Sequence, residues 1–245
     1  MSSRVTFATA VRVLRQLRRD PRTLALLFGV PCLLLWLLKE LLAGQPETFQ
    51  RVGGPLVGLF PFVSMFVVTS VGMLRERTTG TLERLMALPL AKLDLLAGYG
   101  AAFALVAAVQ CGAVSALGFG GLGLTVAGSL WVVIAFAIGN ALLGMALGLF
   151  LSAFATTEFQ AVQFMPAVVF PQVLLSGLFV PRDRMAHGLR IASDALPLTY
   201  AYDALERTVR GGTLGARGVA DAAVIGGSVL LALALGALTL RRRTP

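Results

Sequence analysis

The chain has 245 residues, of which 57% are hydrophobic and 13% charged, with a net charge of +9 and a mean hydropathy of +0.82. Soluble domains carry about 25% charged residues, so this composition excludes an ordinary soluble protein. It predicts a single all-α polytopic membrane domain over residues 1–245. Nucleic-acid binding is disfavoured despite the positive charge, because aromatic residues do not interleave with the basic runs.

The N-terminal segment, residues 4–19, predicts an arginine-rich amphipathic helix. Its apolar side holds Phe7, Ala10, Val11, Leu14 and Leu17, and its basic side holds Arg4, Arg12, Arg15 and Arg19. A signal peptide would also place basic residues before an apolar run, but this charged stretch is long and no small-residue cleavage site follows it. We therefore expect a retained helix that lies in the membrane interface.

Six membrane spans are expected along the rest of the chain. Their predicted bounds are 23–42, 53–74, 95–117, 125–152, 159–180 and 222–240. No charged residue occurs from Leu95 through Thr157, which is long enough for two crossings of about 20 residues each. The glycines between positions 118 and 123 predict the turn that separates these two crossings.

The arginines predict the orientation of the spans. They gather before the first span, after the second span and in the tail after the last one. Because cytoplasmic loops carry an excess of arginine and lysine, we expect both termini to be cytoplasmic, in a bacterial-type cell membrane.

The fifth span contains two prolines, Pro166 and Pro171, which remove two backbone donors and should bend or break its helix. Residues 182–217 then carry charges of both signs. Two short helices are expected there, Met185–Ala195 and Tyr200–Val209, with Pro197 between them. They are too short to span, so we expect them to lie on the outer leaflet or to dip into it.

A charged segment, residues 76–89, connects the second and third spans. Apolar side chains recur in it at helical spacing, at Leu82, Leu85, Met86 and Pro89. Gly80 can act as the N-cap, Glu83 lies in the first turn where the helix dipole favours an anion, and Pro89 ends the helix. So small an apolar face needs a partner groove; the alternative is a loop that rests on lipid headgroups.

Two motifs resemble those of ABC-2 type permeases, the membrane subunits of ATP-driven exporters similar to the daunorubicin-resistance permeases. The first is Glu76-Arg77-x-x-Gly80-Thr81-Leu82-Glu83-x-Leu85-x-x-x-Pro89. The second runs through Pro171, Leu175-Ser176-Gly177, Phe179 and Pro181 to Pro197-Leu198-Thr199-Tyr200 and Asp203-Ala204-Leu205. The resemblance covers essentially the whole chain, although Ala186 and Glu206 stand where the family often has proline and arginine.

The resemblance implies that residues 76–89 form a cytoplasmic coupling helix that docks on an ATP-binding subunit. The implied contact residues are Glu76, Arg77, Gly80, Thr81, Leu82, Glu83, Leu85, Met86 and Pro89. ATP and Mg²⁺ would be bound by that partner, since this chain has no Gly-x4-Gly-Lys-Ser/Thr loop and no cofactor is expected in it. A second permease copy or a paralogue would complete the transporter, which would serve multidrug efflux and antibiotic resistance.

Polar residues inside the spans are costly against lipid and tend to face other helices or a cavity. Ser64, Thr69, Gln163 and Gln172 are the predicted substrate-pathway residues, with hydrogen bonding between helices as the alternative. Gly144 and Gly148 predict close helix packing. The expected substrate is an amphipathic drug, antibiotic or lipid-like molecule.

Other functions remain open alternatives. One is lipid or polysaccharide export by the same architecture. An ion-coupled transporter would need charges at mid-span, whereas the charges here lie near span ends. A lipid-modifying enzyme would need a base or a metal within the membrane, and the single histidine, His187, lies outside the predicted spans. No catalytic or metal-binding residue is therefore predicted.

Overall fold

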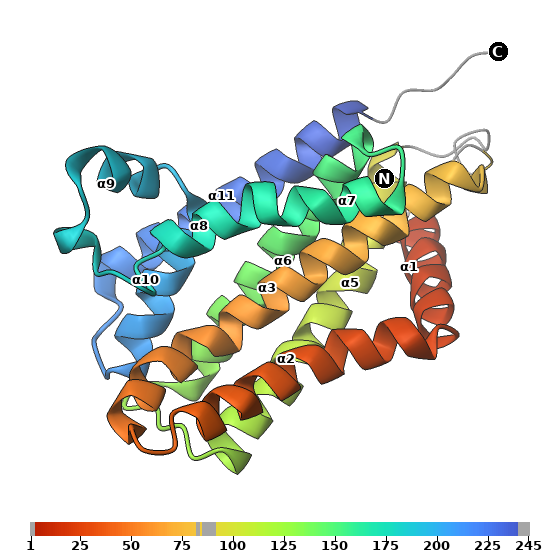
Figure 1. Cartoon of the computed structure of the whole chain (residues 1–245). Helices are drawn as coiled ribbons and strands as arrows, with labels where there is room; N and C mark the ends of the chain where they lie inside the picture. Colours follow the sequence, from red (N-terminus) through yellow and green to blue (C-terminus); the bar gives the residue numbers. More distant parts are fainter. Residues whose placement is uncertain (1–2, 82–83, 85–91, 240–245) are drawn as a thin grey trace.

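The computed structural model describes residues 3–81, 84 and 92–239, and all regular structure in that part of the chain is helical (Figure 1). The α-helices are α1 (Ser3–Arg18), α2 (Pro21–Leu41), α3 (Pro46–Thr78), α5 (Lys92–Ser115), α6 (Leu130–Leu151), α7 (Glu158–Phe164), α8 (Phe170–Leu175), α9 (His187–Asp194), α10 (Pro197–Val209) and α11 (Gly215–Thr239). The all-α prediction is confirmed.

Five helices in the described residues are long and apolar enough to cross a membrane: Pro21–Leu41, Pro46–Thr78, Ala97–Gly121, Leu130–Phe154 and Gly215–Thr239. The predicted fifth span is instead a row of short pieces, in which the π-helical turn Met165–Val169 joins α7 to α8. The prolines at 166 and 171 explain this break, because neither can donate to the preceding turn.

The helix ends differ from the predicted bounds of the second, third and fourth spans. The helix of the second span is 33 residues long and extends past 53–74 at both ends, so Arg75, Glu76 and Arg77 belong to α3. The glycine cluster does not end the third span at once, because Ala116–Gly121 continues it as a π-helical turn. The turn follows at residues 122–129, and α6 begins at Leu130 rather than at 125.

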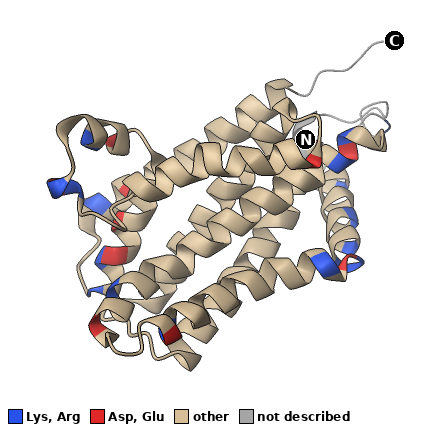
Figure 2. Cartoon of the chain, viewed as in Figure 1, with Lys and Arg blue, Asp and Glu red and all other residues tan. Residues whose placement is uncertain are grey.

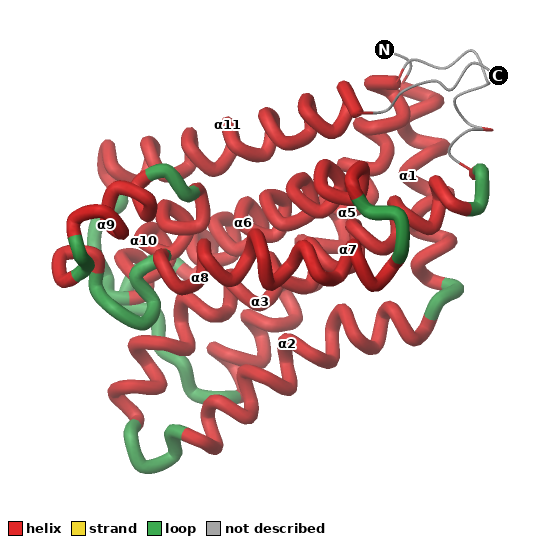
Figure 3. The backbone as a smooth tube through the Cα atoms, turned by 45° about the horizontal axis from the view of Figure 1, so that its top comes forward, coloured by secondary structure: helices red, strands yellow, loops and turns green. Residues whose placement is uncertain are grey.

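Charged residues gather at the two ends of the bundle and leave its middle apolar (Figure 2). Helix α1 lies across one end, where α3 and α11 also end, and α9 and α10 lie at the opposite end (Figures 1 and 3). We call these the α1 end and the α9 end. This distribution matches a bundle whose middle faces hydrocarbon and whose ends face water.

Helix α3 packs most extensively against α6. A Cβ atom at Gly144 would lie 2.2 Å from the carbonyl oxygen of Phe62, and one at Gly148 would lie 2.5 Å from that of Phe66. The absence of side chains at both glycines therefore allows the two backbones to touch. The predicted close packing at this glycine pair is confirmed.

Helix α1 packs on α5, with Ala10 and Val13 buried. Gly98 permits this contact, because a Cβ there would lie 2.5 Å from Cβ of Thr9. On the predicted apolar face of α1, Ala10 is buried and Leu14 and Leu17 are half-buried, whereas Phe7 is 71% exposed.

The two short helices predicted between residues 182 and 217 are present, but they differ in burial. Helix α9 is largely exposed, whereas α10 packs among α3, α6 and α11 with Leu198, Ala201 and Leu205 buried. Helix α10 is therefore part of the bundle and α9 is not, while the prediction that both lie on the outer leaflet or dip into it stays a prediction.

Candidate functional site: a cavity between α1, α2 and α3

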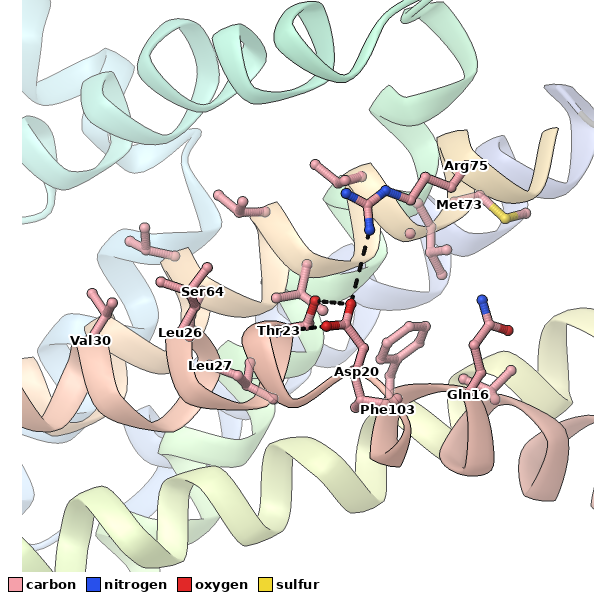
Figure 4. A pocket seen from close by; sticks show the side chains of 18 of the residues that line it. Gln16, Asp20, Thr23, Leu26, Leu27, Val30, Ser64, Met73, Arg75 and Phe103 are labelled. Atoms are coloured by element: carbon pink, nitrogen blue, oxygen red, sulfur yellow. Dashed lines mark hydrogen bonds and ion pairs between the residues drawn. The ribbon is translucent and has the colours of Figure 1, made fainter. Parts of the chain in front are cut away.

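A cavity of about 590 Å³ lies between α1, α2 and α3, and Tyr99 and Phe103 of α5 contribute to its wall (Figure 4). Its wall is mostly valine, leucine and phenylalanine. Three of the α2 residues that line it, Leu26, Val30 and Leu34, are exposed. The cavity is therefore open along this apolar helix.

Apart from Ser64 on α3, the labelled polar residues of the wall lie near the junction of α1 and α2 (Figure 4). Asp20 caps α2: its carboxylate accepts from the Thr23 N–H at 3.1 Å and from the Thr23 hydroxyl at 2.6 Å. These hydrogen bonds lower the pKa of Asp20, because they favour the charged carboxylate. Its side chain stays 39% exposed. Asp20 is therefore an ionised group held in one position at the mouth of the cavity.

Arg75 lies opposite Asp20 but is engaged elsewhere. Its Nε and Nη2 atoms bind both carboxylate oxygens of Glu158, at 2.6 and 3.0 Å. The distance from Arg75 Nη1 to Asp20 Oδ2 is 4.0 Å (Figure 4). Since a bidentate pair is the stronger arrangement, Glu158 neutralises most of the Arg75 charge.

A hydrogen-bond cluster joins three helices beside the cavity. Pro31 has no N–H, so the carbonyl of Leu27 lacks its usual donor four residues ahead. Gln110 of α5 replaces that donor, with Nε2 at 2.7 Å from the Leu27 carbonyl oxygen. The same amide also donates to the Ser64 hydroxyl on α3. This buried glutamine thus holds α2 and α3 at a fixed separation next to the cavity.

An ion pair links α1 to the end of α3. Arg12 Nη2 lies 3.2 Å from Glu76 Oε2, and the Glu76 side chain is only 6% exposed. Arg12 also donates to the Tyr99 hydroxyl, and its guanidinium lies 5.5 Å from the centroid of the Tyr99 ring. Glu76 therefore faces inward, toward α1.

The structure brings one of the four predicted pathway residues, Ser64, to the cavity. Thr69 is buried between α3 and α6, where its hydroxyl is 2.7 Å from the Met65 carbonyl oxygen and 3.2 Å from that of Met145. Gln163 is exposed on α7, and Gln172 is buried with Nε2 at 3.2 Å from the Val168 carbonyl oxygen. These three residues do not line the cavity.

The predicted coupling residues are only partly described. Glu76 and Arg77 lie in the last turn of α3, and Gly80, just after this helix, has a φ of +71°, which favours glycine. The Gly80 carbonyl accepts from the Arg84 N–H at 3.1 Å, as an N-cap carbonyl does. Thr81 is half-buried. The remaining predicted contacts, Leu82, Glu83, Leu85, Met86 and Pro89, lie outside the described residues.

Sequence reasoning missed Asp20, Arg75 and Gln110 as site residues. An aspartate directly before a proline is a readable start of a helix, and Pro31 signals a carbonyl that needs another donor. Neither signal shows which residue from another helix lies next to Asp20 or to the Leu27 carbonyl. The cavity could therefore not be predicted from them.

The fold and the cavity define a class: a multi-pass helical membrane protein with room for an apolar molecule at one end. The family model for "ABC-2 type transporter" matches residues 4–208, and the chain belongs to this family of transporter permeases. The predicted resemblance is thereby confirmed.

Two curated relatives illustrate the similarity. The chain is 27% identical over 150 residues to ABC transporter G family member 20 of Dictyostelium discoideum, a match that covers 61% of this chain and 20% of that protein. It is 29% identical over 148 residues to the probable multidrug ABC transporter permease YbhR of Escherichia coli K12, over 60% of this chain and 40% of the relative. The matches thus span less than half of each relative.

Proposed function

We propose that the chain is the permease subunit of an ABC exporter that moves an amphipathic drug, antibiotic or lipid-like molecule out of the cytoplasm. The observation that carries this proposal is the cavity of about 590 Å³, which has apolar walls, a polar mouth and an opening along the apolar helix α2. Small-molecule sites have volumes of about 300–1,000 Å³ and mostly apolar walls. A molecule dissolved in the membrane could reach this one directly.

The driving force would come from a separate ATPase subunit that binds ATP and Mg²⁺ and docks on residues 76–89. Helix α3 supports this coupling, because it lines the cavity and continues without interruption to Thr78, next to that segment. A rigid helix transmits displacement along its length. Closure of the ATPase subunits would therefore change the cavity wall.

In this arrangement the α1 end faces the cytoplasm of a bacterial-type cell, and both termini lie inside. A second permease copy or a paralogue would complete the transporter. The apolar middle of the bundle and the arginines of α1 support this placement.

Co-purification with a cognate ATPase subunit tests the docking step. Glu83→Lys combined with Leu85→Asp should abolish co-purification, because it reverses a charge and removes an apolar contact at the proposed interface. Glu47→Lys, an exposed charge reversal in the first turn of α3, serves as the matched control. Retention of the ATPase by the double variant would refute the docking interface.

Transport itself is tested in inside-out vesicles that contain both subunits. ATP should drive uptake of a fluorescent amphipathic dye, and the permease without the ATPase should give none. ATP-independent uptake driven by an ion gradient would instead establish a secondary transporter.

A further inference from the structure

We propose that Asp20 selects the head group of the transported molecule, and that the cavity binds amphiphiles whose head is a cationic amine. The ammonium would lie against the Asp20 carboxylate at the mouth, and the tail would lie along α2 toward Ser64. This inference rests on the proposed function, because it names the chemistry of the molecule that the same cavity takes.

The charges at the mouth favour a cation. The charged residues of the described cavity wall are Asp20, Arg75 and Glu76. Arg75 is bound by Glu158 through two hydrogen bonds, and Glu76 is paired with Arg12. Asp20 has only the Arg75 contact at 4.0 Å as its ion pair. These five side chains together carry one net negative charge, located at Asp20; Arg18, Arg19 and Arg22 flank Asp20 in the sequence and are exposed, but they do not line the cavity.

Asp20 also has the capacity to bind an ammonium group. An ionised carboxylate offers about four acceptor positions, and the two hydrogen bonds from Thr23 occupy one on each oxygen. The side chain is 39% exposed, so the remaining positions are accessible. Because Thr23 already fixes the carboxylate, little further ordering is needed when a ligand binds.

The shape of the cavity fits a long tail. Its α2 wall extends from Asp20 to Leu34, a distance of about 20 Å at the helical rise of about 1.5 Å per residue. The lining residues Leu26 and Val30 are exposed, so the cavity is open toward the membrane along α2. An amphiphile of the adjacent leaflet would carry its head at the level of α1 and its tail at the level of these side chains.

The first experiment measures binding to the full-length permease in phosphatidylcholine nanodiscs without the ATPase, with empty nanodiscs as the blank. The probes are tetradecylammonium and tetradecyl sulfate, which share one tail. Asp20→Asn should weaken tetradecylammonium binding about five- to tenfold and should not weaken binding of the sulfate, whose head the carboxylate repels. Asparagine retains the N-cap oxygen, so α2 should begin as before. Glu47→Gln, an exposed carboxylate in the first turn of α3, should change neither affinity.

The second experiment fills part of the cavity with a larger side chain. A Cβ at Gly72, which lines the cavity, meets no atom within 4 Å. Gly72→Leu should therefore place its side chain in empty space and weaken both probes. Gly112→Leu on α5, where a Cβ also meets nothing within 4 Å and which lies outside the cavity wall, is the control.

Three results would overturn the inference. The first is that Asp20→Asn changes the affinity for both probes equally or for neither. The second is that Gly72→Leu leaves both affinities unchanged. The third is that the variants alter the oligomeric state, which would mean that a second copy covers the cavity. ATP-driven dye uptake that continues without charge-selective binding would refute this inference alone. Charge-selective binding without ATP-driven uptake by the complex would refute the proposed function instead.

Discussion

The two sides of α3 show opposite packing. Toward α6 the helices touch through backbone at Gly144 and Gly148, and Asn140 of α6 donates to the Gly58 carbonyl at 3.0 Å. Toward α2 the same helix borders a cavity of about 590 Å³. Close glycine packing allows little relative movement. Toward α2 the packing is less extensive: Leu27 and Leu35 are buried in the core and Gln110 bonds the Leu27 carbonyl, but the cavity lies beside these contacts. Helices α3 and α6 thus form one rigid unit, and α2 forms the less tightly packed wall of the site.

The largest effect is expected at the close-packed side. Gly144→Leu places a Cβ 2.2 Å from the Phe62 carbonyl oxygen and 2.9 Å from its carbonyl carbon, both of which are backbone atoms that cannot rotate away. We expect a loss of about 3 kcal/mol or more in the free energy of unfolding, read as a lower thermal transition in detergent. Gly112→Leu should show no such loss, and equal transitions for the two variants would contradict the rigid unit.

The ion pair between α1 and α3 should give the next largest effect. Arg12→Ala leaves the Glu76 carboxylate buried without its arginine. The expected cost is about 2 kcal/mol, below that of a fully buried pair because Arg12 is partly exposed. The double variant Arg12→Ala/Glu76→Gln should recover part of it, since no unpaired charge remains. A double variant as unstable as the single one would show that the charge is not the cause.

Gln110 offers a test of the hydrogen bond that holds α2. Gln110→Leu removes the donor to the Leu27 carbonyl and should cost about 1–2 kcal/mol. Pro31→Ala supplies a backbone N–H for the same carbonyl, so Gln110→Leu should cost about 1 kcal/mol less in that background. Thermal unfolding of the four proteins measures this coupling. Strict additivity would mean that the proline and the glutamine act independently.

At the open side of α3, the smallest stability effect is expected for Gly72→Leu. Because nothing lies within 4 Å of a Cβ at this position, the free energy of unfolding should stay within about 0.5 kcal/mol of the parent. Gly144 of α6 contacts one side of α3, and Gly72 lies on the side of α3 that faces the cavity. Comparison of the two variants therefore measures how differently the two sides of α3 are packed. A loss as large as that of Gly144→Leu would show that the cavity closes in solution.

No change is expected when the pH is lowered moderately. The Thr23 hydrogen bonds lower the pKa of Asp20, so its carboxylate stays charged below the usual value of about 3.9. Its contribution to stability is present above the unfolded-state pKa and is lost only as the pH falls through the folded-state pKa. The preference for tetradecylammonium should thus be equal at about pH 7 and pH 5. A preference that disappears by pH 5 would point to another group.

Much of the fold could be predicted from local signals. Pro166 and Pro171 indicated the broken fifth span, and Gly144 and Gly148 indicated the contact with α3. The ends of helices were less predictable, because the charged Arg75-Glu76-Arg77 continues α3 instead of ending it. The burial of α10 was missed, since a short amphipathic helix has the same pattern on a membrane surface as in a bundle.

The sequence by itself determined that the chain is helical, that it crosses a membrane repeatedly, and which family motifs it carries, because hydropathy, prolines and glycines act over a few neighbouring residues. Only the tertiary structure decided that Asp20, Ser64 and Arg75 surround one cavity while Thr69, Gln163 and Gln172 do not. That outcome depends on how whole helices rotate and approach one another. Gly144 and Gly148 allow α3 to pack directly against α6. The hydrogen bond from Gln110 to the Leu27 carbonyl, which Pro31 leaves without its usual donor, positions α2.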